Sequence, residues 1–475
     1  MRFNLRHIVP IALLLLAGCG VETPVSETLP VAAEELGQEQ SMLQASECPS
    51  CLVGTEGARF VSGFEREHVV EDVYHYRIRL QVGATAHDVI TLHRVVREKG
   101  AWRPVRAPDS VFMVHGDAWN FQAAFMSSTL SAAVEDKKSI AVYLARKGVD
   151  VWGIDLRWTH VPEGTADFSF MKGWNLGTHA QDVGTGLTVA RAVRTLTGSG
   201  HQKMNLLGWS RGAAVAYAYM NAETQRPQGQ RHVSGFIPVD MVMKFGPEAE
   251  PQRQWACVRA AVGDLVLRSG RYEGNLLGPG AGVAILYVGQ QARNNPDAPA
   301  QIPGIELPPI TFRQLGVLVG AATFALLTNE AYGIQPSVPF YHFSQAAGFA
   351  GGLPTALENV NEPAFFDFLS TARPFQSFTE LVESDRMQCG DESLPYDDHL
   401  AQVKVPVLYV GAAGGFGSYG VASTKRLGSK DVSVHLVQKL PDAYRVADYG
   451  HADLFLASDA ETAVWEPIYQ WMKKH

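Results

Sequence analysis

A serine set between two glycines is the first candidate for chemistry in this chain. The stretch "NLLGWSRGAA" (205–214) places Ser210 between Gly208 and Gly212, after an apolar run and before a series of small residues. A serine hydroxyl becomes an effective nucleophile when an adjacent base removes its proton. Gly-x-Ser-x-Gly at the junction of a strand and a helix is typical of a sharp turn that exposes such a serine. We therefore predict that Ser210 is a nucleophile rather than a serine in an ordinary tight turn.

The base that Ser210 requires must be chosen from 15 histidines. His451, in "DYGHADLF", lies after the last predicted strand and before the terminal helix, where a loop at the sheet edge is expected. The order serine then histidine along the chain is one that serine hydrolases use. His435 lies inside an alternating strand and His115 in a loop, so both are expected to be structural. His451 is therefore the predicted base.

Two backbone N–H groups are needed to hold the negative oxygen that forms when the serine attacks a carbonyl. Arg211, the residue after the nucleophile, supplies the first. The second is expected in the loop after "VFMVHG" (111–116), from Asp117 or Ala118. A carboxylate aimed at the oxyanion would destabilise it. Either the Asp117 side chain points away, or Ala118 is the donor.

Three aspartates are candidates for the acid that orients the histidine. Asp240 follows the strand in "GFIPVDMV" (235–242), beside the predicted sharp turn at Ser210, the nucleophile elbow. Asp442 and Asp448 lie closer to His451 along the chain, but within its own loop. We favour Asp240 and keep the other two as alternatives.

The elements that position these residues alternate along the chain. Strands are predicted at 74–82, 88–96, 110–116, 149–156, 203–210, 232–242, 405–413 and 431–437. Helices are predicted at 139–148, 178–198, 211–223 and 460–474. Such alternation predicts an α/β fold with a mostly parallel, eight-stranded sheet and helices on both faces.

A long segment interrupts the alternation and divides the predicted core into residues 58–242 and 404–475. This insertion, residues 243–403, combines Gly- and Pro-rich loops with apolar helical stretches, at 315–328 and 363–372. The first stretch is too short for a membrane span. We expect a large helical cap over the active edge of the sheet; the alternative is an insertion that never touches substrate.

The N-terminus has the features of a targeting segment. Arg2 and Arg6 precede an apolar run over residues 8–17, and Cys19 follows small residues. This pattern resembles a bacterial lipoprotein signal, which implies removal of residues 1–18, a lipid on Cys19, and export to a bacterial membrane, at the outer membrane and facing the periplasm or the surface. An uncleaved anchor is the alternative, but the run is short for a bilayer. Residues 19–57 would form an acidic tether.

Export favours disulfides among the remaining cysteines. They are Cys48, Cys51, Cys257 and Cys389, and they allow three pairings that the sequence does not distinguish. Cys257 and Cys389 lie far apart in the insertion and could staple it.

Composition limits the partners. The chain has 475 residues, 46% of them hydrophobic, and a net charge of −8, which argues against nucleic acid as the main partner. No HExxH motif, P-loop or dinucleotide fingerprint occurs, so we expect neither a metal nor a cofactor.

With these parts assembled, the sequence resembles the α/β-hydrolase superfamily, and within it the acid lipases of gastric and lysosomal type. The similar stretches are "VFMVHG", "LARKGVDVWGIDLRWTH", "ADFSFMKGWNLGTHAQDV", "TGSGHQKMNLLGWSRG" and "YGHADLF". The resemblance implies a Ser-His-Asp lipase or esterase with a lid over an apolar pocket. Two features depart from it. The aspartate expected after the seventh strand is missing from "YVGAAGGFGSYG" (409–420), and Trp209 and Arg211 replace the usual His and Gln around the serine.

The expected function is hydrolysis of apolar acyl esters by a Ser210–His451–Asp240 acyl-enzyme mechanism on a membrane-tethered lipoprotein. Acyl transfer to another alcohol, or hydrolysis of an amide or polyester, would use the same residues. The rival of a different class is a non-catalytic surface lipoprotein that binds an apolar ligand.

Overall fold

A mixed sheet forms the centre of the molecule. The computed structural model describes residues 58–61, 63–274, 281–302, 307, 309–322, 338–350 and 353–475. Within these residues the sheet has ten strands in the order β1-β3-β4-β6-β5-β7-β8-β13-β14, and β2 pairs with β3. The strands are β1 (Arg59–Phe60), β2 (Glu65–Val70), β3 (Val73–Gln81), β4 (Val89–Arg97), β5 (Ser110–Val114), β6 (Asp150–Asp155), β7 (Met204–Trp209), β8 (Val233–Val239), β13 (Val407–Ala412) and β14 (Val432–Val437).

Eight of these strands are the predicted ones. From β6 to β14 all neighbours are parallel, and β3, β4 and β6 pair antiparallel at the other side. The sequence did not indicate β1 and β2, which pair with β3 at its edge. Strand β2 reads "EREHVV", with four polar residues followed by two apolar ones, so it lacks the alternation that could mark it as a strand.

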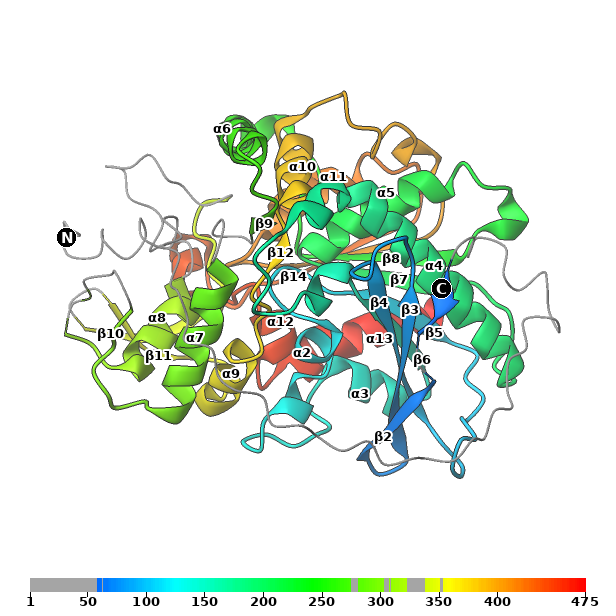
Figure 1. The fold of residues 1–475 in the computed structure, drawn as a ribbon, viewed down its shortest axis with the longest axis horizontal. Helices are drawn as coiled ribbons and strands as arrows, with labels where there is room; N and C mark the ends of the chain where they lie inside the picture. Colours follow the sequence, from blue (N-terminus) through cyan, green and yellow to red (C-terminus); the bar gives the residue numbers. More distant parts are fainter. Residues whose placement is uncertain are drawn as a thin grey trace.

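Helices cover both faces of the sheet (Figure 1). One face carries α4 (Leu176–Leu196) and α5 (Arg211–Glu223); the other carries α2 (Phe121–Phe125), α3 (Ile140–Arg146) and α13 (Glu466–Lys474). Short helices α11 (Val421–Thr424) and α12 (Asp453–Leu456) follow β13 and the histidine loop. The predicted terminal helix begins as a π-helix over Glu461–Trp465 and continues directly as α13.

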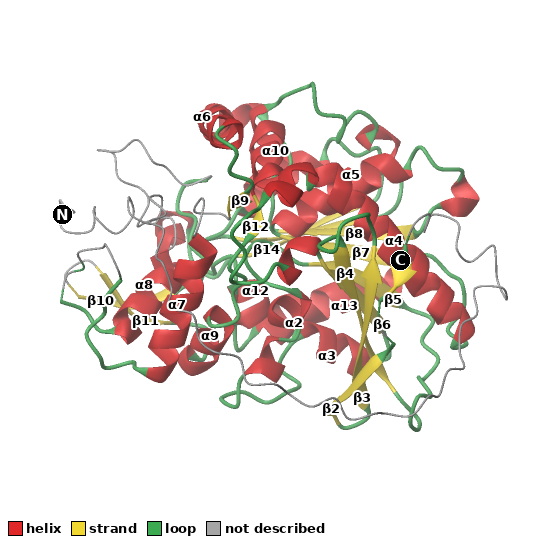
Figure 2. Ribbon diagram, viewed as in Figure 1, coloured by secondary structure: helices red, strands yellow, loops and turns green. Residues whose placement is uncertain are grey.

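The segment between β8 and β13 is largely helical. Its helices are α6 (Glu250–Arg268), α7 (Ala281–Asn294), α8 (Phe312–Ala322), α9 (Glu362–Leu369) and α10 (Phe378–Cys389). Two small antiparallel sheets accompany them, β9 (Glu273–Gly274) with β12 (Gln376–Ser377), and β10 (Ala346–Ala350) with β11 (Leu353–Leu357). Figure 2 shows this predominance of helix to the left of the central strands.

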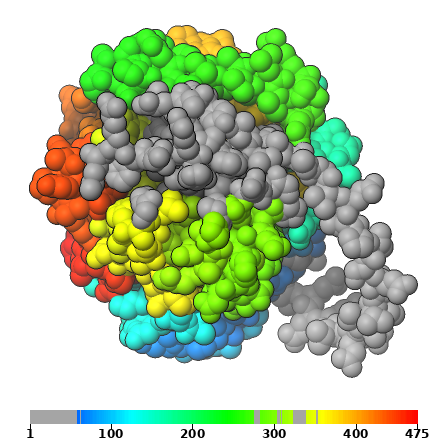
Figure 3. Space-filling view, turned by 90° about the vertical axis from the view of Figure 1, so that its left-hand side faces the viewer, coloured from blue at the N-terminus to red at the C-terminus, as the bar shows by residue number. Residues whose placement is uncertain are grey.

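The inserted helices form two groups. Helices α6 and α10 lie together and are joined by a disulfide between Cys257 and Cys389, one of the pairings that the sequence left open. Helices α7, α8 and α9 form the second group. Figure 3 shows the green of α6 at the top of one face, and the yellow-green and yellow of the second group lower on the same face. No helix in the described ranges has the length and hydropathy that a bilayer span requires. The predicted signal segment, Cys19, the tether, Cys48 and Cys51 lie outside the described residues.

Candidate active site

Ser210 occupies a sharp turn between β7 and α5. Its backbone has φ 56° and ψ −132°, a conformation that L-residues rarely adopt. The flanking glycines make the turn sterically possible. A Cβ on Gly208 would lie 2.5 Å from the carbonyl oxygen of Gly212, and a Cβ on Gly212 would overlap the carbonyl of Val114. The pattern at 208–212 therefore forms a strained elbow of the kind that presents a nucleophile.

Strained backbone recurs around this turn. Ala118 and Asp240 also have positive φ angles, 65° and 44°. They belong to loops after β5 and β8, the strands on either side of β7. Such conformations persist only where the surrounding structure imposes them, and they concentrate at functional sites.

His451 is bonded to Asp240. The distance from its Nδ1 to the Asp240 Oδ2 is 2.7 Å, and both side chains are buried, at 2% and 0% exposure. Since an ionised carboxylate only accepts, the geometry assigns the proton to Nδ1 and leaves Nε2 as the acceptor nitrogen. Of the three aspartates considered from the sequence, the structure brings Asp240 to the histidine.

The two alternatives serve other purposes. The Asp448 carboxylate accepts from the N–H groups of Lys439, Leu440 and Tyr449, at 2.7 to 3.0 Å, and so closes the base of its own loop. Asp442 is exposed and bonds to Gln438 and Arg445.

The loop after β13 holds the Asp240 carboxylate. The N–H groups of Ala412, Phe416 and Gly417 donate to its oxygens at 3.0, 3.2 and 2.9 Å. A Cβ on Gly415 would collide with the same carboxylate, so a glycine is required there. The loop that lacks an acid in the sequence thus supplies hydrogen bonds to an acid from the neighbouring strand.

The insertion fixes the histidine loop from the other side. The His451 N–H donates to the carbonyl of His342 at 3.1 Å, and the Ala452 N–H donates to that of Phe343 at 2.6 Å. Within the loop, the Gly450 N–H donates to Asp453 Oδ2 at 2.7 Å. Residues 338–345 are therefore part of the site's framework.

Aromatic rings surround the imidazole. Trp209 stacks on His451 with ring centroids 5.2 Å apart and planes 23° apart. Tyr341, Phe343 and Phe416 lie with centroids 5.4 to 6.0 Å away. Trp209, the residue before Ser210, thus packs against the predicted base.

The loop after β5 approaches the serine closely. A Cβ on Gly116 would lie 2.6 Å from that of Ser210. The buried His115 is structural, as predicted: its Nε2 accepts from the Leu156 N–H at 3.1 Å, and its Nδ1 donates to the Gly116 carbonyl at 3.0 Å. Burial lowers the pKa of His115, so the neutral ring suits this role.

The side chains of Asp117 and Arg211 face one another. Arg211 Nε lies 2.9 Å from Asp117 Oδ1, and Nη2 lies 3.2 Å from Oδ2. Burial alone would lower the pKa of Arg211, but the charge and hydrogen bonds of Asp117 outweigh it and raise that pKa. The Asp117 carboxylate is thus directed to a cation.

The two candidate oxyanion donors after Gly116 differ in their bonding. The Ala118 N–H donates to Gln376 Oε1 at 3.2 Å. In the described part of the chain, the Asp117 N–H meets no acceptor. The Arg211 N–H opens helix α5, where backbone donors lack a helical partner. The geometry leaves Asp117 and Arg211 as the pair with free N–H groups.

A small cavity of about 40 Å³ connects these groups. Ser210 and His451 line it together, with an aromatic wall that includes Trp119, Phe343 and Phe416. Polar side chains also line it, among them Arg211 and, from α10, Asp385 and Gln388. The described residues contain no group of three or more His, Cys, Asp or Glu side chains arranged to hold a metal ion.

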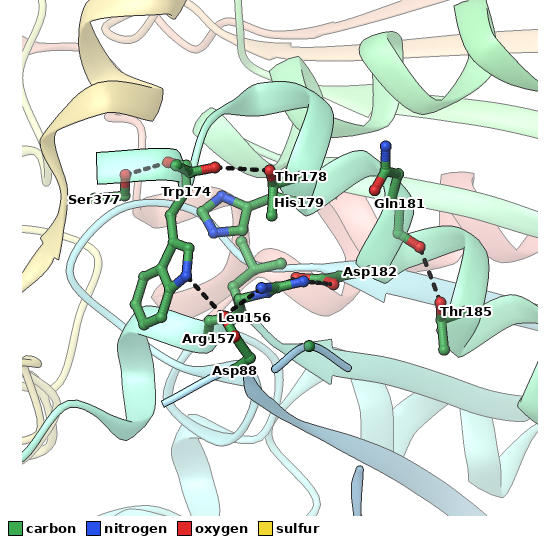
Figure 4. Close-up of polar contacts among 12 residues, drawn as sticks. Asp88, Leu156, Arg157, Trp174, Thr178, His179, Gln181, Asp182, Thr185 and Ser377 are labelled. Carbon is green, nitrogen blue, oxygen red and sulfur yellow. Dashed lines mark hydrogen bonds and ion pairs between the residues drawn. The ribbon is translucent and has the colours of Figure 1, made fainter. Parts of the chain in front are cut away.

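A buried polar network connects the insertion to the core (Figure 4). Arg157 pairs with Asp182 at 2.7 Å and with Asp88 at 2.6 Å. Asp88 accepts from the Trp174 indole N–H at 3.0 Å, and the carbonyl of Trp174 accepts from the hydroxyl of Ser377. Strand β12 is therefore tied to the core immediately after Gln376.

Sequence reasoning missed the residues that the insertion contributes. Gln376, Tyr341 and Phe343 belong to no motif, and each is brought to the site by chain that is distant from Ser210 in sequence. The sequence identified Arg211 as a backbone donor but did not indicate that its side chain would pair with Asp117.

Comparisons with known proteins support the fold. No protein-family profile matches the chain, and no curated protein matches it. Among solved structures, a "putative lipase" from Sulfolobus solfataricus aligns with a TM-score of 0.55 at 18% identity, over 88% of this chain and 99% of that one. At this identity the likeness shows the fold alone.

Other solved structures align less well. A monoglyceride lipase variant from Saccharomyces cerevisiae has a TM-score of 0.38 at 12% identity, over 88% of this chain and 97% of that one. Epoxide hydrolase A from Mycobacterium thermoresistibile has a TM-score of 0.40 at 14% identity, over 82% and 97%. Similarity at this level supports no inference about chemistry.

Proposed function

We propose that this chain, which has the α/β-hydrolase fold, is a serine ester hydrolase that uses Ser210, His451 and Asp240. The observation that carries the proposal is the convergence of three separate features. They are a strained serine elbow, a buried His451–Asp240 hydrogen bond of 2.7 Å, and a cavity that Ser210 and His451 line together. A purely structural serine would need none of the three.

The reaction proceeds in two acyl transfers. Ser210 Oγ attacks the ester carbonyl carbon while His451 Nε2 takes its proton, and that proton then passes to the leaving alcohol. Water attacks the acyl-enzyme, gives a proton to His451, and releases the acid as the proton returns to Ser210. Asp240 holds the ring in the required tautomer and stabilises the imidazolium that forms in each half.

The N–H groups of Asp117 and Arg211 hold the oxyanion in this proposal. Two observations support this assignment: the loop at Gly116 lies against Ser210, and Arg211 is the first residue of α5. The first turn of α5 adds positive partial charge near the developing oxygen.

The size of the cavity favours substrates with a short acyl chain. A volume of about 40 Å³ accommodates only a few water-sized groups, and its aromatic wall favours an apolar one. We therefore expect acetyl and butyryl esters to be turned over faster than palmitoyl esters. Long-chain esters would require the cap to move.

The test is a chain-length series of nitrophenyl esters on wild type and Ser210→Ala, together with labelling by a fluorophosphonate. Wild type should hydrolyse the short esters and be labelled at Ser210, and Ser210→Ala should do neither. If folded wild-type protein is not labelled, the proposed enzyme activity is wrong, and the non-catalytic, ligand-binding alternative takes its place. Adding a second alcohol to the assay distinguishes acyl transfer from hydrolysis, since an acyltransferase forms the new ester.

We further propose that a lipid on Cys19 anchors the protein to a bacterial membrane. The basic residues, the apolar run and the cysteine support it, and the acidic stretch that follows would act as a tether. Growth with a labelled fatty acid should label wild type and not Cys19→Ser. Absence of label on wild type would remove the anchor without affecting the proposed chemistry.

A further inference from the structure

We propose that Asp117, Arg211 and Gln376 form a charge-neutral clamp that positions the two N–H groups of the oxyanion hole, and that the insertion completes the hole through Gln376. This inference rests on the proposed function. Gln376 is assigned as a positioning residue, because it acts through Asp117 and Ala118 rather than on substrate.

The clamp links the same two residues that carry the free N–H groups. Arg211 meets the Asp117 carboxylate with two nitrogens, at 2.9 and 3.2 Å. A two-pronged contact between a guanidinium and a carboxylate restrains both partners in distance and in orientation. The backbone of Asp117 is therefore held at a set position relative to the start of α5.

Gln376 joins the clamp from the insertion. Its amide NH₂ donates to Asp117 Oδ1, and its Oε1 accepts from the Ala118 N–H at 3.2 Å. The residue is fully buried, and Ser377 next to it is bonded to the core through Trp174 (Figure 4). Engagement of the Ala118 N–H helps to hold the strained backbone at that residue, where φ is 65°.

The second function of the clamp is to neutralise the charge of the Asp117 carboxylate. An unpaired carboxylate next to the oxyanion would raise the energy of the transition state, because solvent screens buried charges only weakly. Asp117 and Arg211 expose only 8% and 10% of their side chains, so solvent does not neutralise them. The pair keeps the site electrically neutral while its backbone donors remain available.

The experiment compares Arg211→Met with the double variant Asp117→Asn/Arg211→Met. With the cation removed, the buried carboxylate should lower kcat by about 100-fold with little change in KM. Removing the negative charge as well should restore kcat to within about tenfold of wild type.

A purely structural role predicts a different result. The double variant would then be as slow as Arg211→Met or slower, because it lacks both side chains; that outcome overturns the clamp. If Arg211→Met does not fold, Arg211→Lys and Gln376→Met test positioning, since the first keeps charge without the fork and the second keeps volume without hydrogen bonds. Each should lower kcat by about tenfold and leave KM unchanged; wild-type kcat in both would overturn the proposal.

Failure of the clamp and failure of the proposed function are distinguishable. If wild type is neither labelled by the fluorophosphonate nor active on esters, both proposals fall. If wild type is labelled and active but its kcat does not respond to these substitutions, only the clamp is wrong.

Discussion

The carboxylate of Asp240 accepts hydrogen bonds from three backbone N–H groups and from His451. These hydrogen bonds satisfy the buried carboxylate and fix its orientation towards His451. The position after β8 can therefore serve as the acid because the loop after β13 lies next to it and has donors to offer. Asp240 after β8 thus takes the place of the acid that is missing after β13. The glycine-rich loop after β13 supplies the hydrogen bonds that hold it.

Asp240→Asn tests this assignment. The amide keeps the shape of the side chain but stabilises the wrong tautomer of His451, so kcat on a short ester should fall by about 10⁴-fold. Asp442→Asn is the matched control, because Asp442 is exposed and bonded only to neighbours in its own loop. Near-normal activity in Asp240→Asn would refute the assignment.

At the scale of elements, the site depends on loops from the core and from the insertion. Backbone groups of the insertion hold the His451 loop, and the loop after β13 holds Asp240. Neither interaction uses a motif, since backbone N–H and carbonyl groups are common to all residues.

Gly415→Ala should impair catalysis without unfolding the protein. The new methyl group would collide with the Asp240 carboxylate and shift it away from His451, and a displacement of about 1 Å can cost about 100-fold in rate. Gly164→Ala is the control, because nothing lies within 4 Å of a Cβ there. Steady-state kinetics and a thermal melt of both variants check the prediction; equal kcat values would contradict it.

The disulfide between α6 and α10 should stabilise the part of the cavity lining that α10 contributes. Asp385 and Gln388 line the cavity just before Cys389, and Arg259 near Cys257 bonds to both. A Cys257→Ser/Cys389→Ser variant should lose about 2–5 kcal/mol of unfolding free energy. Denaturant titrations of the variant and of wild type, with and without reductant, measure this. If reductant destabilises the variant as much as it destabilises wild type, the effect of the reductant does not come from this disulfide.

At the scale of the whole molecule, buried histidines should make stability depend on pH. Burial, together with the charges of Arg191 and Arg226, lowers the pKa of His232 to about 3, and burial lowers that of His160 to about 4. The unfolded chain binds protons at these positions below about pH 6.5, while the folded chain does not. Stability from these groups is therefore complete above that pH and is lost as pH falls towards 4.

Thermal melts from about pH 7 to about pH 4 check this dependence. The melting temperature of wild type should fall across the range, and that of His232→Asn should fall less. Buried carboxylates such as Glu223, whose pKa is raised by burial, act in the opposite direction. The comparison of the two proteins isolates the contribution of His232, and parallel curves would contradict it.

The sequence by itself determined the order of the elements, the elbow and the choice of His451 as the candidate base. Alternating apolar runs, glycines that permit a close strand–helix turn, and small residues after them are local requirements, so they are visible in adjacent letters. The eight main strands and the main core helices accordingly lie where the pattern predicts, within a few residues.

Only the tertiary structure decided which aspartate meets His451, which loop N–H groups remain free, and which disulfide forms in the described chain. These outcomes depend on contacts between segments separated by 100 residues or more, such as the 211 between Asp240 and His451. No local periodicity encodes such pairings. They follow from how the sheet orders its strands and from where the insertion returns to it, because side chains interact over a few ångströms in space and not along the chain.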